Sequence, residues 1–276
     1  GLTINPEQIY PNNLKLWLDA NHSSASTATW TDRSNSANHA TKNGSAITVA
    51  SNVLNGLPVM RYNGTNGNYH SFNRISDIRT AFWVVKYNTG AWWLLGDSST
   101  YHFHGNGLND IFVSNHAHTH IKSGSSFFKN GSSYDLYGAW PTTHAILSLV
   151  TSGNVQANNF SSDRNINGRY ANGDLAELLI FNVPLNALEV QMVEGYLAHK
   201  WGLTTELPSS HPFKDSLLTP TSKSISSAAT ASATVGSAFS YSIVTDVTNP
   251  AYEATNLRPG LTCNLGTGLI SGTPLA

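Results

Sequence analysis

Residues 173–213 decide the fold of this chain, and they read GDLAELLIFNVPLNALEVQMVEGYLAHKWGLTTELPSSHPF. Residues 174–181 within this stretch form a short apolar run, which lies between Gly173 and a turn-forming Asn-Val-Pro at 182–184. A run of that length between such residues predicts a well-buried strand.

A helix is predicted directly after this strand. Asn186 can cap its first turn, with Glu189 as the reciprocal partner in a capping box, and Gly202 is the expected stop. Apolar residues recur at spacings of three and four, so one side of the helix is apolar. These residues are Val190, Val193, Tyr196, Leu197 and Trp201. We therefore expect a helix packed on the outside of a structure made of strands.

Further strands are expected along the first three-quarters of the chain, with glycine or asparagine turns between them. They are residues 14–18, 56–62, 81–87, 91–95, 101–104, 111–121, 126–129 and 145–150. Short strands separated by frequent turn signals are typical of an all-β sandwich. Four tryptophans have apolar, regular neighbours and are assigned to the core: Trp17, Trp30, Trp83 and Trp201.

Several segments resemble laminin-G-like (concanavalin A-like) jelly-roll domains of large secreted bacterial proteins. The resemblance rests on GDLAELLIF at 173–181, EGYLAHKWGL at 194–203 and LPSSHPF at 207–213. It extends to LKLWLDA at 14–20, WTD at 30–32, GLPVMRY at 56–62, and residues 94–97 with 101–104. It implies a jelly-roll domain over residues 1–213, an antiparallel β-sandwich closed by one C-terminal helix. Related sandwiches often carry a calcium ion at their rim.

A second domain is expected over residues 214–276. Residues 214–233 are rich in Ser, Thr and Ala and predict a linker, and residues 239–244 alternate as a strand. The segment NLRPGLTCNLGTGLISGTP at 256–274 resembles the immunoglobulin-like repeats of bacterial surface proteins. We expect a partial immunoglobulin-like β-domain with an unprotected strand edge.

The composition narrows the class of partner and the location. Charged residues make up 11% of the chain and the net charge is −1, so there is no electrostatic case for binding nucleic acid or an acidic membrane. Cys263 is the single cysteine, which rules out an intrachain disulfide. No apolar run approaches the length of a membrane span, and no signal peptide is recognised. We expect a segment of a longer exported bacterial protein, extracellular or at the cell surface, with flanking domains.

The acidic residues give no local signature of a glycosidase. A retaining enzyme needs two carboxylates about 5–5.5 Å apart, which on one strand means a spacing of two. None of the sixteen Asp and Glu residues is two or four positions from another, and Asp174 and Glu177 are expected on opposite faces of their strand. A pair of carboxylates from different strands remains an alternative.

A second enzyme class is an esterase. Gly-Asp-Ser-Ser at 96–99 resembles the nucleophile block of an esterase family, but the downstream Asp-x-x-His of that family is missing. We expect no enzyme.

Histidines alternate along two segments of the chain. If both segments are paired strands, five imidazoles gather on one surface, and three of them could bind zinc or another transition metal. The five are His102, His104, His116, His118 and His120. The alternative is a solvated polar face without metal.

Calcium is a separate candidate, since hard oxygen ligands gather in the same region. These ligands are Asp97, Asn106, Asn109 and Asp110. The alternative for each is an ordinary turn residue.

Glycan binding needs an aromatic platform with polar groups beside it. Candidates lie close together in the sequence around Asp97, with Trp140 as a secondary platform. The full set is Trp92, Trp93, Asp97, Tyr101, His102, His104, Asn106, His116 and Trp140. The preferred hypothesis is a non-catalytic, lectin-like carbohydrate-binding or adhesion module that binds a polysaccharide or glycan. The alternatives are a structural or protein-binding spacer and, less favoured, a polysaccharide hydrolase or lyase.

Overall fold

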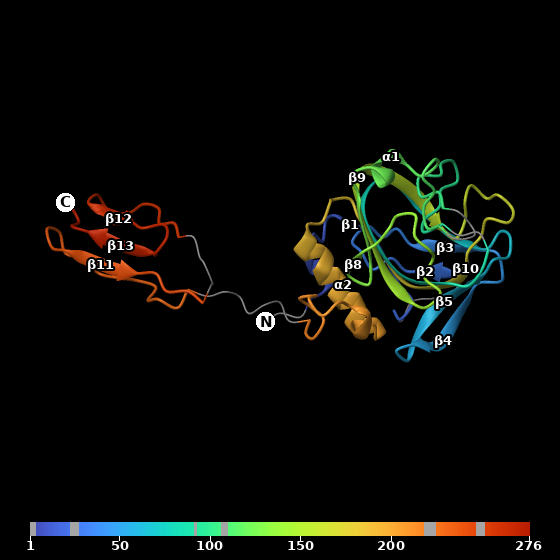
Figure 1. Ribbon diagram of the computed structural model, residues 1–276, viewed down its shortest axis with the longest axis horizontal. Helices are drawn as coiled ribbons and strands as arrows, with labels where there is room; N and C mark the ends of the chain where they lie inside the picture. Colours follow the sequence, from blue (N-terminus) through green and yellow to red (C-terminus); the bar gives the residue numbers. More distant parts are fainter. Residues whose placement is uncertain (1–3, 23–27, 91–92, 106–109, 218–224, 247–251) are drawn as a thin grey trace. The chain divides into compact units, whose positions relative to one another are not determined.

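The computed structural model describes residues 4–22, 28–90, 93–105, 110–217, 225–246 and 252–276. The fold is mostly β, its strand pairs are antiparallel, and the chain divides into two compact units at Leu217 (Figure 1). None of the helices within these ranges combines the length and hydropathy that a membrane span needs.

The described part of the first unit is built on a ten-stranded sheet. Its strands are β1 (Leu14–Asp19), β2 (Thr29–Trp30), β3 (Ala40–Asn43), β4 (Thr48–Leu54), β5 (Leu57–Asn63), β6 (Tyr69–Tyr87), β7 (Ser126–Lys129), β8 (Ser132–Ser133), β9 (Ala145–Phe160) and β10 (Asn172–Phe181). The main order is β4-β5-β10-β6-β9-β7-β8; in addition β1 pairs with β10, and β3 pairs with β6 and β2. Two α-helices, α1 (Thr119–Lys122) and α2 (Ala187–Trp201), accompany two short 3-10 turns, η1 (Pro6–Gln8) and η2 (Thr204–Glu206).

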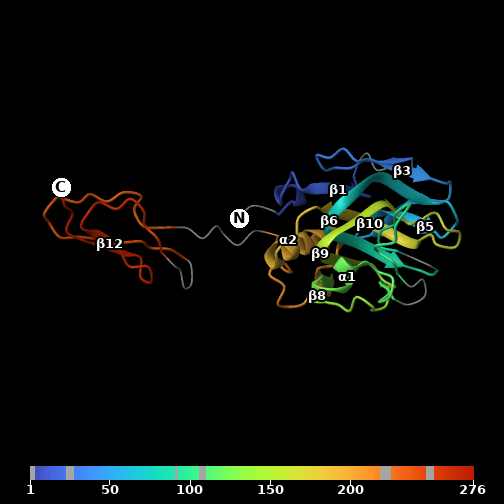
Figure 2. The same ribbon diagram turned by 90° about the horizontal axis from the view of Figure 1, so that it is seen from above.

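Strand β10 is the centre of this unit, and the strand predicted at 174–181 is confirmed within it. Every residue from Gly173 to Phe181 is buried. One edge of β10 pairs with β6, while the other is shared by β5 near its start and β1 near its end. Figure 2 shows β6, β9 and β10 through the middle of the unit, with β1 and β3 on one side and α1 and β8 on the other. Strand β10 is therefore apolar because it is a central strand, with paired strands along both of its edges.

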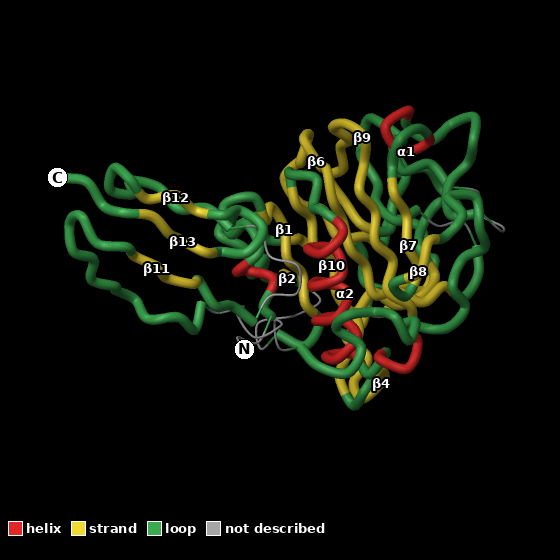
Figure 3. Tube along the Cα trace, turned by 60° about the vertical axis from the view of Figure 1, so that its left-hand side comes forward, coloured by secondary structure: helices red, strands yellow, loops and turns green. Residues whose placement is uncertain are grey.

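Helix α2 confirms the predicted caps. Asn186 and Glu189 form the reciprocal capping box, and Gly202 ends the helix with φ of 70°, a left-handed conformation that glycine adopts without strain. The apolar side, including Val193, Leu197 and Trp201, is buried. The helix contacts β6 and β9, and Figure 3 shows it lying along the strands.

Two of the predicted strands, at 101–104 and 111–121, are wrong, and a third is not formed in its described part. Residues 101–104 form a turn, and residues 111–121 pass through further turns into α1. The two segments do lie together, because the backbone N–H of Val113 donates to the carbonyl of His104 and that of His118 donates to the carbonyl of His102. The alternating histidines therefore belong to loops whose backbone groups are satisfied locally. The returning strand predicted at 91–95 is also not formed at residues 93–95, and residues 91–92 lie outside the described ranges.

The described part of the second unit holds a three-stranded antiparallel sheet. Its order is β11 (Phe239–Ser242), β13 (Leu269–Gly272), β12 (Leu261–Cys263). The strand predicted at 239–244 is confirmed for its first four residues. Apolar side chains of this sheet, such as Tyr241 and Ile270, are only half-buried.

Candidate functional site

The loops that carry the histidines form a pocket of about 300 Å³ at one end of the large sheet. Its lining residues are Ser99, Thr100, Tyr101, His102, His116 and His118. Four of the residues proposed from the sequence for glycan or metal binding therefore share one pocket: Tyr101, His102, His116 and His118. The volume lies at the lower end of the range for small-molecule sites, about 300–1,000 Å³.

The loop that begins at Gly96 is held by a close approach between its backbone and the backbone at the end of β9. Gly96 exchanges backbone hydrogen bonds with Asn159 of β9, and a Cβ added at Gly96 would lie 1.6 Å from the carbonyl oxygen of Ser162. No other residue type fits such an approach without moving the backbone. Gly96 therefore holds the start of the pocket loop against β9.

The buried carboxylate of Asp97 holds the same loop through hydrogen bonds. Its side chain is 1% exposed and is bound bidentately by Arg74, with Nε–Oδ2 and Nη2–Oδ1 distances of 2.8 and 2.9 Å. Ser99 and Thr100 donate their backbone N–H groups to Oδ1. Burial alone would raise the pKa of Asp97, but these hydrogen bonds outweigh burial and lower the pKa to about 2. Asp97 thus shapes the loop, and its occupied oxygens do not fit the role of a calcium ligand.

The five histidines form two contact groups, which come from loops and α1 and not from the predicted paired strands. The ring centroids of His102 and His118 are 4.2 Å apart, and those of His118 and His120 are 5.1 Å apart. His104 and His116 form a second contact at 5.2 Å. Burial is the main cause that lowers the pKa of His102, His104 and His118, and charge repulsion from neighbouring histidines adds to it. Burial of these three rings therefore favours their neutral form.

Tyr101 is the exposed aromatic ring of the site, at 46% exposure. The Arg164 guanidinium lies 4.6 Å from its ring centroid, and the His104 ring meets it edge-on at 5.7 Å. Both Arg164 and a second arginine, Arg169, bind the buried carboxylate of Asp163. The loop that follows β9 thus holds Tyr101 in a fixed orientation beside the pocket.

Trp93 lies behind His104 and is 5% exposed, with Arg169 over its ring at 5.6 Å. Three buried polar atoms of this region have no hydrogen-bond partner: Nε1 of Trp93, Oγ1 of Thr100 and Nδ1 of His104. Buried polar groups are usually paired, so unpaired atoms at one place are a common mark of a water or ligand site. Sequence reasoning missed Thr100, because a lone threonine carries no pattern.

Two further candidates that the structure describes, Trp140 and Asp110, are not among the residues that line this pocket. Trp140 is 4% exposed and stacks on Tyr87 at 5.7 Å, so it is a core residue and the predicted secondary platform is wrong. Asp110 forms an isolated backbone bridge with Ala139. Trp92, Asn106 and Asn109 lie outside the described residues. Among the described residues, no group of three or more His, Cys, Asp or Glu side chains is arranged to hold a metal ion.

A buried acidic pair was missed from the sequence. Asp19 of β1 faces Glu177 of β10 across the strands, and Lys200 of α2 bridges them at 2.6 and 2.8 Å. The side chains of both acids are almost fully buried. Glu177 also accepts hydrogen bonds from Trp17, Tyr196 and Trp201. Burial raises the pKa of Glu177, and Lys200 opposes this shift. The pair ties α2 to the sheet, and its oxygens already have donors.

The register of β10 against β6 also shifts between Leu175 and Glu177. Such a bulge breaks the strict alternation on which the sequence argument for Asp174 and Glu177 relied. Asp174 is held by Arg61 and His144.

No protein-family model and no curated protein matches the chain.

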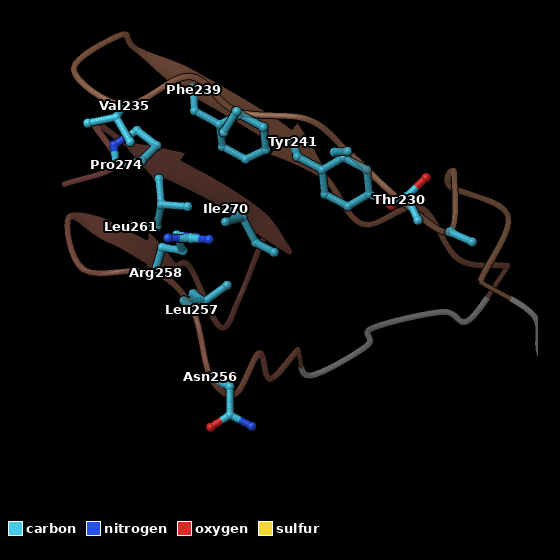
Figure 4. A pocket seen from close by; sticks show the side chains of 13 residues that line it. Thr230, Val235, Phe239, Tyr241, Asn256, Leu257, Arg258, Leu261, Ile270 and Pro274 are labelled. Atoms are coloured by element: carbon cyan, nitrogen blue, oxygen red, sulfur yellow. The ribbon is translucent and has the colours of Figure 1, made fainter. Parts of the chain in front are cut away.

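The second unit has a separate hollow of about 470 Å³, shown in Figure 4. Phe239 and Tyr241 of β11, Leu261 of β12 and Ile270 of β13 lie around it, and Arg258 also lines it. The sheet thus exposes part of an apolar face.

Proposed function

We propose that the chain is a non-catalytic carbohydrate-binding or adhesion module of a larger exported bacterial protein. In this proposal the first unit is a laminin-G-like jelly-roll sandwich, and the second is a partial immunoglobulin-like domain. The module acts outside the cell or at its surface and binds a polysaccharide or glycan. The observation that carries the proposal is the exposed ring of Tyr101 at a pocket lined by hydroxyl and imidazole groups.

A sugar fits this combination for a simple chemical reason. The C–H groups of a pyranose ring pack on an aromatic face, while its hydroxyl groups need hydrogen-bond partners close by. Tyr101 supplies the face, and His102 and His118 supply polar atoms. Arg164 and His104 hold Tyr101 in place, so little side-chain freedom is lost on binding.

The acidic groups around the pocket support binding without catalysis. Asp97 and Asp163 are each bound by arginine, so the oxygens of both carboxylates already have partners. A general acid would need a raised pKa, and Asp97 has the opposite shift. Release of products from a polysaccharide by the purified chain would contradict this part of the proposal.

Binding is tested with immobilised polysaccharides and a glycan array, with and without calcium. Tyr101→Ala should weaken retention about fivefold to 150-fold, if stacking of a sugar on the ring is worth as much as stacking of a nucleic-acid base, about 1–3 kcal/mol. Tyr10→Ala is the matched control, since Tyr10 is also 46% exposed but lies on a different segment. Retention of no polysaccharide under either condition would refute the proposal.

A second candidate is a spacer that binds a protein, and the apolar hollow of the second unit favours it. Phe239 and Tyr241 on its wall are half-buried side chains of the kind that anchor protein interfaces. Under this alternative, Tyr241→Ser abolishes adhesion to cells while Tyr101→Ala leaves it unchanged.

A further inference from the structure

The two closest imidazoles of the pocket have fixed proton positions. The backbone N–H of Gln156 in β9 donates to Nδ1 of His102 at 3.0 Å. The backbone N–H of His120 donates to Nδ1 of His118 at 3.1 Å, where His118 is the N-cap of α1. A nitrogen that accepts an N–H bond carries a lone pair, so the proton of each neutral ring is on Nε2. Both rings are therefore donors at Nε2.

No hydrogen bond with another described residue uses the Nε2 atom of either ring, and neither Nε2 atom belongs to the buried polar atoms that lack a partner. Both rings line the pocket, with centroids 4.2 Å apart. Two rings that can donate through Nε2 thus share the pocket wall.

A transition metal does not fit this pair. A histidine that binds a metal through Nε2 carries its proton on Nδ1 and donates it to a carbonyl or carboxylate. Here each Nδ1 meets a backbone N–H, so the metal-binding tautomer would place two donors against each other. Coordination through Nδ1 would displace the same backbone donors. The zinc hypothesis from the sequence therefore disagrees with the hydrogen bonds of His102 and His118.

An oxyanion fits the same wall. Among the described residues that line the pocket there is no carboxylate or amide side chain, and the adjacent Asp97 has its oxygens occupied by Arg74 and the loop. A sugar hydroxyl that accepts an N–H bond must also place its own proton, whereas a carboxylate or sulfate only accepts.

We infer that His102 and His118 form a metal-free donor pair that binds the carboxylate or sulfate of an acidic sugar. This inference rests on the proposed carbohydrate-binding function and names the ligand class for that site. Tyr101 then holds the sugar ring while the two imidazoles hold its oxyanion.

The test uses the full chain, isothermal calorimetry in EDTA, and matched pairs of ligands. One pair is oligogalacturonate and its methyl ester, and the other is a sulfated oligosaccharide and its desulfated form. We expect the charged member of one pair to bind at least tenfold more tightly than its neutral partner, and the preferred pair separates carboxylate from sulfate. Imidazole ¹⁵N shifts should show the Nε2–H tautomer at both histidines.

His118→Asn is the decisive variant. Asparagine is a strong N-cap, so its side-chain oxygen can still accept the His120 N–H, but it cannot reach the position of Nε2. It should lose about tenfold in affinity with an unchanged melting temperature, and His102→Asn should behave alike. The control is His39→Asn, because Nδ1 of the exposed His39 also accepts a backbone N–H, from Asp32, but outside the pocket.

The outcomes separate the two proposals. If charged and neutral sugars bind equally and Tyr101→Ala abolishes binding, the module binds carbohydrate but the oxyanion inference is wrong. If no sugar binds, both fail. Stoichiometric zinc binding that both His102→Asn and His118→Asn abolish would also overturn the donor pair.

Discussion

Trp201 is the strongest test of how α2 is attached to the sheet. Its ring is fully buried, and its Nε1–H donates to Oε2 of Glu177 at 2.7 Å. The side chain therefore contributes both apolar burial and a hydrogen bond to a buried carboxylate. Two substitutions separate these contributions: Trp201→Phe keeps much of the ring and loses the donor, and Trp201→Ala loses both.

The expected magnitudes differ clearly. A hydrogen bond to a charged group contributes about 1.5–3 kcal/mol, which is the expected cost of Trp201→Phe. Truncation of a buried Trp to Ala costs about 3–5 kcal/mol from the cavity alone, so Trp201→Ala should cost about 5 kcal/mol or more. For a unit of this size about 1 kcal/mol lowers the melting temperature by roughly 2–4 °C. The expected decreases are therefore about 3–12 °C for Phe and more than about 10 °C for Ala.

Urea unfolding and thermal melts measure both variants. Leu188→Ala is the control, because Leu188 lies on the same helix at 52% exposure and should change stability by less than about 0.5 kcal/mol. In a Glu177→Gln background Trp201→Phe should cost less, since the charged acceptor is gone. A Trp201→Phe variant as stable as the parent would refute the hydrogen bond, and a stable Trp201→Ala variant would refute the packing of α2.

Three further predictions concern single residues. Gly96→Ala should prevent correct folding of the pocket loop, because its Cβ would lie 1.6 Å from the backbone oxygen of Ser162; a normal yield and an unchanged melting temperature would contradict the close approach. Asn186→Ala should destabilise the chain by about 1 kcal/mol in urea unfolding through loss of the capping box, whereas Asn186→Ser should restore most of it. Asp97 has a folded-state pKa of about 2, below its value of 3.8 in an unperturbed group, so its ionised form stabilises the fold above about pH 4 and this contribution is lost as the pH falls toward 2. Asp97→Asn should accordingly destabilise the chain at pH 7 and have little effect at pH 2; equal destabilisation at both values would argue against the ion pair with Arg74.

The sequence by itself determined the elements whose signals are local. The strand at β10 follows from an apolar run between turn residues, and α2 follows from its spacing and caps. The core positions of Trp17, Trp30, Trp83 and Trp201 follow from apolar neighbours, and each is at most 1% exposed. These features depend on a few adjacent residues, so they can be read without knowing the rest of the fold.

Trp140 shows where local reasoning fails. A tryptophan in a Gly-Ala-Trp-Pro segment predicts an exposed loop residue, yet its ring stacks on Tyr87 at the end of β6. The histidines show the same limit in another form. Their alternation predicts strands, whereas the carbonyls of His102 and His104 accept hydrogen bonds from a second loop.

Only the tertiary structure decided which polar groups meet. Asp19 and Glu177 are 158 residues apart and face each other because β1 and β10 are paired in register. The proton positions of His102 and His118 are set by backbone N–H groups, one from distant β9 and one from the first turn of α1. Sequence periodicity predicts which face of its own helix or strand a side chain lies on. It does not predict which distant residue long-range packing places opposite that side chain.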